Sequence, residues 1–284
     1  MPHYVTFKPV ALIALAGAAL ACGPVDHEPS TPIEITRSSL SAVLGDDVQP
    51  TGMAIDEESG QRYFLDPALG ILEALDTGEV VVRWSPPPEL PELTDLCAVG
   101  GGRFVAAANG DGYVIDIAAG TARQHFCLEP GGDPGFDPGF DPGAPAALDH
   151  LNRAVACDIE AGLIYGQPQT VPQEGEPLPI RSEMASYRLS TGADVDWVLL
   201  PEATYHAGGM TVLESGRILL GAGSTISLYD ASTQVLTQLA DLSRSGVQRI
   251  EAITIDRAAG TIELVDGGAE ELVSVPLAAL GLAP

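Results

Sequence analysis

The chain has 284 residues but a single lysine, Lys8. It has 13 basic and 39 acidic residues, which give a net charge of −26. Proteins that bind nucleic acid need clustered cations to displace counterions from phosphates, so this charge excludes that function. The same charge repels anionic lipid headgroups. Such acidity is typical of a soluble exported protein or of a saline habitat, and divalent-cation binding is the alternative interpretation.

Common catalytic signatures are also missing. The sequence holds neither a Gly-x-Ser-x-Gly nucleophile elbow nor a phosphate-binding loop. Aromatic residues make up only 5% of the chain, so aliphatic side chains must fill the core. The two tryptophans, Trp84 and Trp197, fall in segments predicted to be outer strands, where packing is the default explanation for them.

One apolar run, from Pro9 to Ala21, stands at the N-terminus. It is too short to cross a bilayer, which takes about 20 residues, and it fits the apolar part of a secretory signal. The segment Ala19-Leu20-Ala21-Cys22 resembles the lipobox of bacterial lipoproteins. The resemblance implies a signal peptide over residues 1–21 and a mature chain that begins with a lipidated Cys22.

Several acyl chains on one cysteine hold a protein durably at a membrane, whereas a single chain binds marginally. We therefore expect the membrane to be a partner through the lipid anchor, followed by a tether over residues 22–31. Gly23 stands where Asp often signals retention at the inner membrane, which favours the outer membrane of a bacterial cell envelope. The alternative is ordinary cleavage after Ala21, which leaves Cys22 as a free thiol.

If Cys22 carries lipid, three cysteines remain: Cys97, Cys127 and Cys157. An odd number in an oxidising compartment predicts one disulfide and one thiol. Cys127 and Cys157 flank a predicted insertion, so a staple there is conceivable. The sequence leaves all three pairings open.

From about residue 50 the chain repeats a short apolar strand, a turn of acidic or small residues that includes Gly, and a second strand. Pro- and Gly-rich insertions near residues 129–147 and 167–182 lengthen two of the repeats. Without them the period is roughly 42 residues, in the range of propeller blades, and the short strands with Gly turns predict antiparallel sheet. The aligned turn positions are Asp56, Gly100, Asp158, Glu214 and Asp256.

The predicted fold is therefore an all-β β-propeller over residues 32–284, with five blades. Six blades result if residues 37–51 or one insertion hides a degenerate blade, and a pair of stacked β-sandwiches is the structural rival. The last repeat stops near Leu277, one strand short. We expect the segment Pro32–Thr36 to supply that outer strand, because this pairing would hide an open sheet edge.

The segment Gln49–Asp56 resembles the opening of NHL and YVTN-type propeller repeats, and Ala252–Asp256 matches it as well. The second repeat matches poorly, since Gly100 replaces the acidic residue. The resemblance bears on fold more than on function. It implies one enzymatic alternative, because gluconolactonase-like and streptogramin-lyase-like propellers use a central divalent metal held by acidic, Asn or His residues. No such ligand set maps onto this sequence residue by residue.

Propeller ligands usually sit at the mouth of the central channel, on loops that lead into the inner strands. In this chain His150 and His206, together with Asp95 or Glu251, would make a set of two imidazoles and a carboxylate that suits a transition metal. Ordinary polar loop residues are the alternative interpretation, since the spacings match no metal motif. The channel-mouth candidates are Asp95, His150, Asn152, Arg153, Tyr205, His206, Arg249 and Glu251.

These observations predict a lipid-anchored, exported propeller that presents a binding face to an envelope protein or a glycan, without catalysis. No cofactor is predicted for that function. The enzymatic alternative is a metal-dependent lactonase or lyase with a divalent cation at the channel mouth. A third hypothesis is a structural envelope protein without a soluble ligand.

Overall fold

The computed structural model describes residues 32–75, 77–108, 111–127, 150–170, 181–200 and 207–283. The predicted signal peptide, Cys22, the tether and the insertion at 129–147 lie outside the described residues. Within the described part of the chain, no helix has the length and apolar character needed to cross a membrane.

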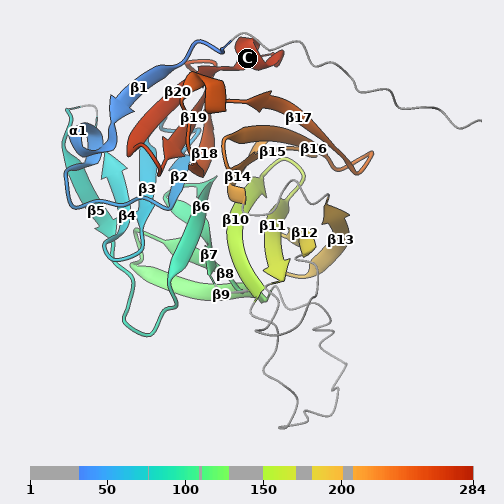
Figure 1. Ribbon diagram of the computed structural model, residues 1–284. Coiled ribbons are helices and arrows are strands. Elements are labelled where there is room, and N and C mark those ends of the chain that lie inside the picture. Colours follow the sequence, from blue (N-terminus) through green and yellow to red (C-terminus); the bar gives the residue numbers. More distant parts are fainter. Residues whose placement is uncertain are drawn as a thin grey trace, which may run out of the picture. The chain divides into compact units, whose positions relative to one another are not determined.

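Five four-stranded antiparallel sheets are arranged around a common centre (Figure 1), and each is a blade. Neighbouring innermost strands β2, β6, β10, β14 and β18 contact one another in turn, and β18 contacts β2, so the ring closes. The all-β, five-bladed propeller is thus confirmed. The strands are, in blade 1, β2 (Gly52–Ile55), β3 (Arg62–Asp66), β4 (Gly70–Ala74) and β5 (Val80–Trp84); in blade 2, β6 (Leu93–Gly100), β7 (Arg103–Ala108), β8 (Asp111–Asp116) and β9 (Thr121–Cys127); in blade 3, β10 (His150–Asp158), β11 (Leu163–Thr170), β12 (Arg181–Arg188) and β13 (Asp194–Leu200); in blade 4, β14 (Ala207–Glu214), β15 (Arg217–Ala222), β16 (Thr225–Asp230) and β17 (Val235–Asp241); and in blade 5, β18 (Ile250–Asp256), β19 (Thr261–Asp266), β20 (Glu271–Pro276) and β1 (Thr36–Ser39).

Two regions differ in detail from the sequence-based expectation. Residues 37–51 do not form a sixth blade, because they hold most of β1 and the short helix α1 (Leu40–Leu44). Strands β11 and β12 extend into the predicted insertion at 167–182 from both of its ends. Two short 3-10 helices complete the described structure, Ser243–Ser245 before β18 and Leu277–Leu280 after β20.

The hydrophobic core lies between the blades as five clusters, one at each interface. Aliphatic side chains dominate, as the low aromatic content predicts, but two aromatic pairs stand at interfaces. Tyr63 of blade 1 meets Phe104 of blade 2 with ring centroids 4.8 Å apart, and Phe126 stacks on Tyr187 of blade 3 at 4.4 Å. Trp84 is 5% exposed within the cluster between blades 1 and 2, which confirms its packing role.

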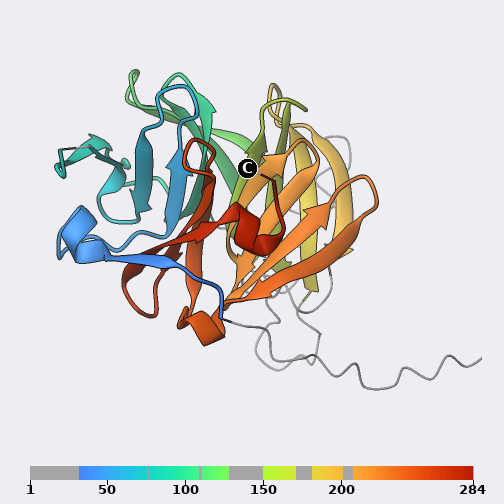
Figure 2. The same cartoon turned by 90° about the horizontal axis from the view of Figure 1, so that it is seen from above.

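The N-terminal segment supplies the outer strand of blade 5, as predicted, but from residues further along the chain. The strand β1 pairs with β20 from Thr36 opposite Ser274 onward (Figures 1 and 2), and the expectation of a strand over 32–36 was wrong. Continuing that register would place Glu34 opposite Pro276, which has no N–H to donate. Ile33 instead packs on the cluster between blades 4 and 5, and its carbonyl accepts a hydrogen bond from the Ser245 hydroxyl at 2.8 Å.

Arg37 links this closing strand to blade 5. Its guanidinium pairs with Glu271 of β20 and donates to the carbonyl of Ser245 at 2.7 Å. Because the pair is only half-buried, we expect Arg37→Ala to lower the free energy of unfolding by about 1 kcal/mol. Urea denaturation measures this change. Arg123→Ala, on the exposed face of β9, serves as the control and should change stability by less than about 0.5 kcal/mol. Equal losses in both variants would contradict the closing role.

Candidate functional site

At the beginning of the innermost strands, neighbouring blades approach each other through their backbones. A Cβ atom added to Gly52 would lie 2.9 Å from the Cα of Asp95, and one added to Gly208 would lie 1.9 Å from the carbonyl oxygen of Ile250. A Cβ at Gly209 would also meet β18, at 2.8 Å from the Ile253 nitrogen. Only glycine fits at such distances, so these residues let the inner strands meet at this end of the channel.

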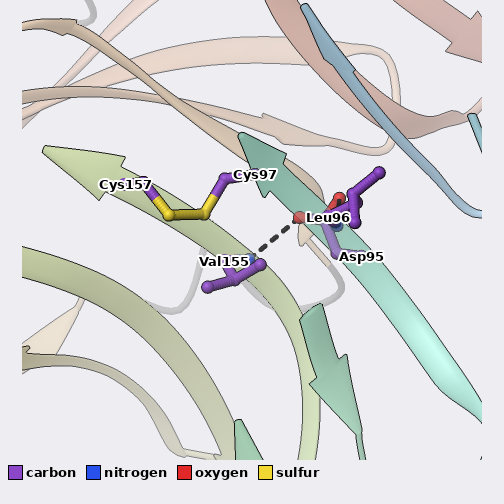
Figure 3. The surroundings of a disulfide bond; sticks show 5 residues. All are labelled: Asp95, Leu96, Cys97, Val155 and Cys157. Atoms are coloured by element: carbon purple, nitrogen blue, oxygen red, sulfur yellow. Dashed lines mark hydrogen bonds between the residues drawn. A yellow bond between two sulfur atoms is a disulfide. The ribbon is translucent and has the colours of Figure 1, made fainter. Parts of the chain in front are cut away.

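Asp95 lies in β6 and is 1% exposed. Its Oδ1 accepts a hydrogen bond from the Leu96 N–H at 2.8 Å, and its Oδ2 accepts one from the Val155 N–H of blade 3 at 2.9 Å (Figure 3). The Met210 N–H of blade 4 also donates to this carboxyl group. Burial raises the pKa of Asp95 well above its usual value, while the three N–H donors oppose that rise. Asp95 thus joins three blades around the channel.

The other predicted site residues occupy varied positions. Arg249 and Glu251 form an ion pair with each other where β18 begins, and the Arg249 side chain is 64% exposed. His150, Asn152 and Arg153 belong to β10, but their side chains lie outside the described residues, as do Tyr205 and His206. Among the side chains that the structure describes, no group of three or more His, Cys, Asp or Glu could hold a metal ion.

A cavity of about 590 Å³ lies at the other end of the channel, where the innermost strands end. Its deep part is apolar and includes Met53, Leu96 and Met210, each 1% exposed. Its rim consists of the turns that follow the inner strands. Sequence reasoning missed this end of the channel, although the aligned turn positions lie on it. In the sequence analysis, these turn positions served only to measure the period of the repeat.

The rim is strongly acidic. Among the lining residues that the structure describes, Arg257 is the single cation. It pairs with Glu57 at 2.6 Å and donates to the carbonyl of Leu213 at 2.7 Å, so it is already engaged. The rim carboxylates are Asp56, Glu57, Glu58, Asp158, Glu160 and Glu214.

Two of these carboxylates also hold the rim in place. The Oδ1 of Asp56 accepts a hydrogen bond from the Glu58 N–H at 3.0 Å, which closes its own turn. Asp158 accepts one from the Ala161 N–H at 2.9 Å, and its second oxygen accepts one from the Gly216 N–H of blade 4 at 2.8 Å. The repeated acidic residue therefore closes a turn, and at Asp158 it also fastens the next blade.

Blade 2 departs from this pattern with the turn Gly100–Gly102, in which all three residues have positive φ. That conformation favours glycine over any residue with a Cβ. The substitution of Gly100 for an acidic residue removes one carboxylate from the rim. The freed space is next to Glu58, whose carboxylate would lie 3.7 Å from a Cβ at Gly100.

A disulfide joins Cys97 of β6 to Cys157 of β10 in the wall of the cavity (Figure 3). Their Cα atoms are 5.7 Å apart. Of the three pairings that the sequence left open, the structure has this one, which links blades 2 and 3. Cys127 ends β9, and its side chain lies outside the described residues.

No protein-family model matches the chain, and no curated protein sequence matches it either. Solved structures are similar to it at low identity. A gluconolactonase from Xanthomonas campestris is 16% identical, with a TM-score of 0.45 over 87% of this chain and 94% of that one. Virginiamycin B lyase from Staphylococcus aureus is 12% identical, with a TM-score of 0.45 over 86% and 99%. The Pan2 WD40 domain from Neurospora crassa is 11% identical, with a TM-score of 0.41 over 79% and 62%. Similarity at this level does not extend to activity.

Proposed function

We propose that this protein is a lipid-anchored, exported propeller that binds a partner in the cavity at the end of its central channel, without catalysis. The observation that carries the proposal is the cavity itself, to which all five blades contribute. Its volume of about 590 Å³ falls within the range of about 300–1,000 Å³ that is typical of ligand sites. A ring of short strands holds such a cavity rigidly, which suits recognition.

The state of the buried carboxylates supports binding more than proton transfer. Asp95 accepts hydrogen bonds from three backbone N–H groups, and Asp158 is held by two turns. A general acid or base must exchange its proton with a substrate within hydrogen-bond reach. Carboxylates already bound by backbone donors are better suited to keeping the wall of a binding site in shape.

Occupation of the cavity can be tested by filling it. Thr211 lines the cavity from β14, and Thr211→Trp should abolish capture of the partner from native envelope extracts. Thr237→Trp, on the exposed outer strand β17 of the same blade, is the matched control and should capture the partner as the wild type does. Thermal unfolding establishes that both variants fold. Undiminished capture by a folded Thr211→Trp variant would refute the cavity as the binding site.

The lipid anchor is proposed on the sequence around Cys22. Cells that express the protein should incorporate a clickable palmitate analogue into the wild type and into Cys127→Ala, but not into Cys22→Ala. Fractionation should place the labelled protein in the outer membrane, where an envelope protein or a glycan would be the partner. Label that survives Cys22→Ala would rule out this anchor.

A further inference from the structure

The charge of the cavity rim restricts what can enter it. Two of its carboxylates, those of Glu58 and Glu160, are exposed, and in the described part of the chain neither has a hydrogen bond or an ion pair. The only guanidinium among the lining residues is held by Glu57 and two backbone carbonyls. Walls of low dielectric that carry charge of one sign focus the field into a cleft. The cavity therefore attracts a cation and repels an anion.

The deep part of the cavity has a different chemistry. Ile55, Val99 and Val212 line it with partly exposed apolar side chains. Met53, Leu96 and Met210 lie beneath them, each 1% exposed and packed between the blades. An occupant that matches both zones has an apolar stem and a positively charged head.

A glycan fits this lining poorly. No Phe, Tyr or Trp is among the lining residues, all of which belong to the described part of the chain, so a sugar ring has no aromatic face on which to stack. The acidic rim would repel the carboxylates or phosphates of charged glycans. Of the two partners proposed for this propeller, the lining thus favours the protein.

We infer that the cavity accepts a basic segment of a partner polypeptide. An arginine or lysine side chain at the tip of a loop would lay its methylene stem along Val99 and Val212 and turn its charged head toward the carboxylates of Glu58 and Glu160. Long cationic side chains are amphipathic in this way, with an apolar stem and a solvated head. This inference rests on the proposed function, because it specifies the occupant of the same cavity.

Binding of a fluorescein-labelled, N-acetylated tetra-arginine peptide tests the inference on the purified full-length protein in neutral detergent, by fluorescence anisotropy. A tetra-citrulline peptide of the same shape has no charge and serves as the probe control. The double variant Glu58→Gln, Glu160→Gln should weaken tetra-arginine binding at least tenfold. Glu79→Gln, Glu89→Gln removes two exposed carboxylates elsewhere and should stay within twofold of the wild type.

Two results would overturn the basic occupant: equal binding of the arginine and citrulline peptides, or equal losses in the two double variants, which would mean diffuse attraction to an acidic protein. Capture of the native partner separates this failure from failure of the proposed function. If Thr211→Trp loses the partner while Glu58→Gln, Glu160→Gln retains it, the cavity binds an occupant that is not basic. If Thr211→Trp also retains the partner, the cavity is not the binding site.

Discussion

Replacing Cys97 and Cys157 together by serine should lower the free energy of unfolding by about 4 kcal/mol. The two cysteines are 60 residues apart in sequence, and the stabilisation by a cross-link grows with the logarithm of the loop that it closes in the unfolded chain. A loop of this length corresponds to about 4 kcal/mol in the chain-entropy treatment. The loss is large compared with the roughly 5–15 kcal/mol that stabilises a typical domain.

Urea denaturation of the double-serine variant measures this loss, and the wild type in a reducing agent should reproduce it. Cys127→Ser changes a cysteine outside this disulfide and should change stability by less than about 1 kcal/mol. Because the disulfide ties β6 to β10, hydrogen exchange should speed up most in these two strands. A loss below about 1 kcal/mol in the double variant would mean that packing between blades 2 and 3 makes the disulfide redundant.

The number of blades and the closure of the ring could be predicted because both depend on local signals. Each repeat ends its first strand at a turn with its own chemistry, such as the Asp56 carboxylate that closes a turn through the Glu58 N–H. Because such a turn signal is local in sequence, it recurs with the period of a blade regardless of how the blades pack. The closing strand was displaced by a few residues, since its start depends on Pro276 across the sheet and on the packing of Ile33.

Predicting the disulfide requires knowing which strands are neighbours, and the repeat contains part of this information. Cys97 and Cys157 both lie in the first strand of consecutive repeats, and first strands of consecutive blades are neighbours in a propeller. The pairing follows once that neighbourhood is recognised, whereas the insertion beside Cys127 only made a Cys127–Cys157 staple conceivable and left all three pairings open. Whether two residues of neighbouring inner strands lie opposite each other depends on the relative register of those strands. The sequence alone does not give this register.

The sequence also did not predict which end of the channel holds the cavity. Loops before the inner strands contain His and Arg, which suggest chemistry, and they led to Asp95, Arg249 and Glu251. Backbone contacts at Gly52, Gly208 and Gly209 bring the inner strands together at that end. The cavity therefore lies beyond them, at turns whose carboxylates resemble ordinary turn residues when the chain is read one residue after another.

Asp95→Ala should be the most damaging single substitution in the channel. It would remove the acceptor of three buried N–H groups, those of Leu96, Val155 and Met210. A buried donor without a partner costs about 1–3 kcal/mol, so the total loss should be about 3 kcal/mol or more. Asp116→Ala on the same blade removes one exposed hydrogen bond, to the Ala119 N–H, and should cost less than about 1 kcal/mol.

The pH dependence of this loss distinguishes the two effects on the Asp95 carboxyl. Burial raises its pKa in the folded protein, whereas an unfolded aspartate has a pKa of about 3.9. A raised pKa contributes stability that is fully present below the unfolded pKa and is lost as the pH rises through the folded value. The difference in unfolding free energy between wild type and Asp95→Ala should therefore be largest near pH 4 and shrink toward pH 8 in urea titrations. A difference that grows with pH would mean that the three N–H donors outweigh burial and that Asp95 is held as a carboxylate.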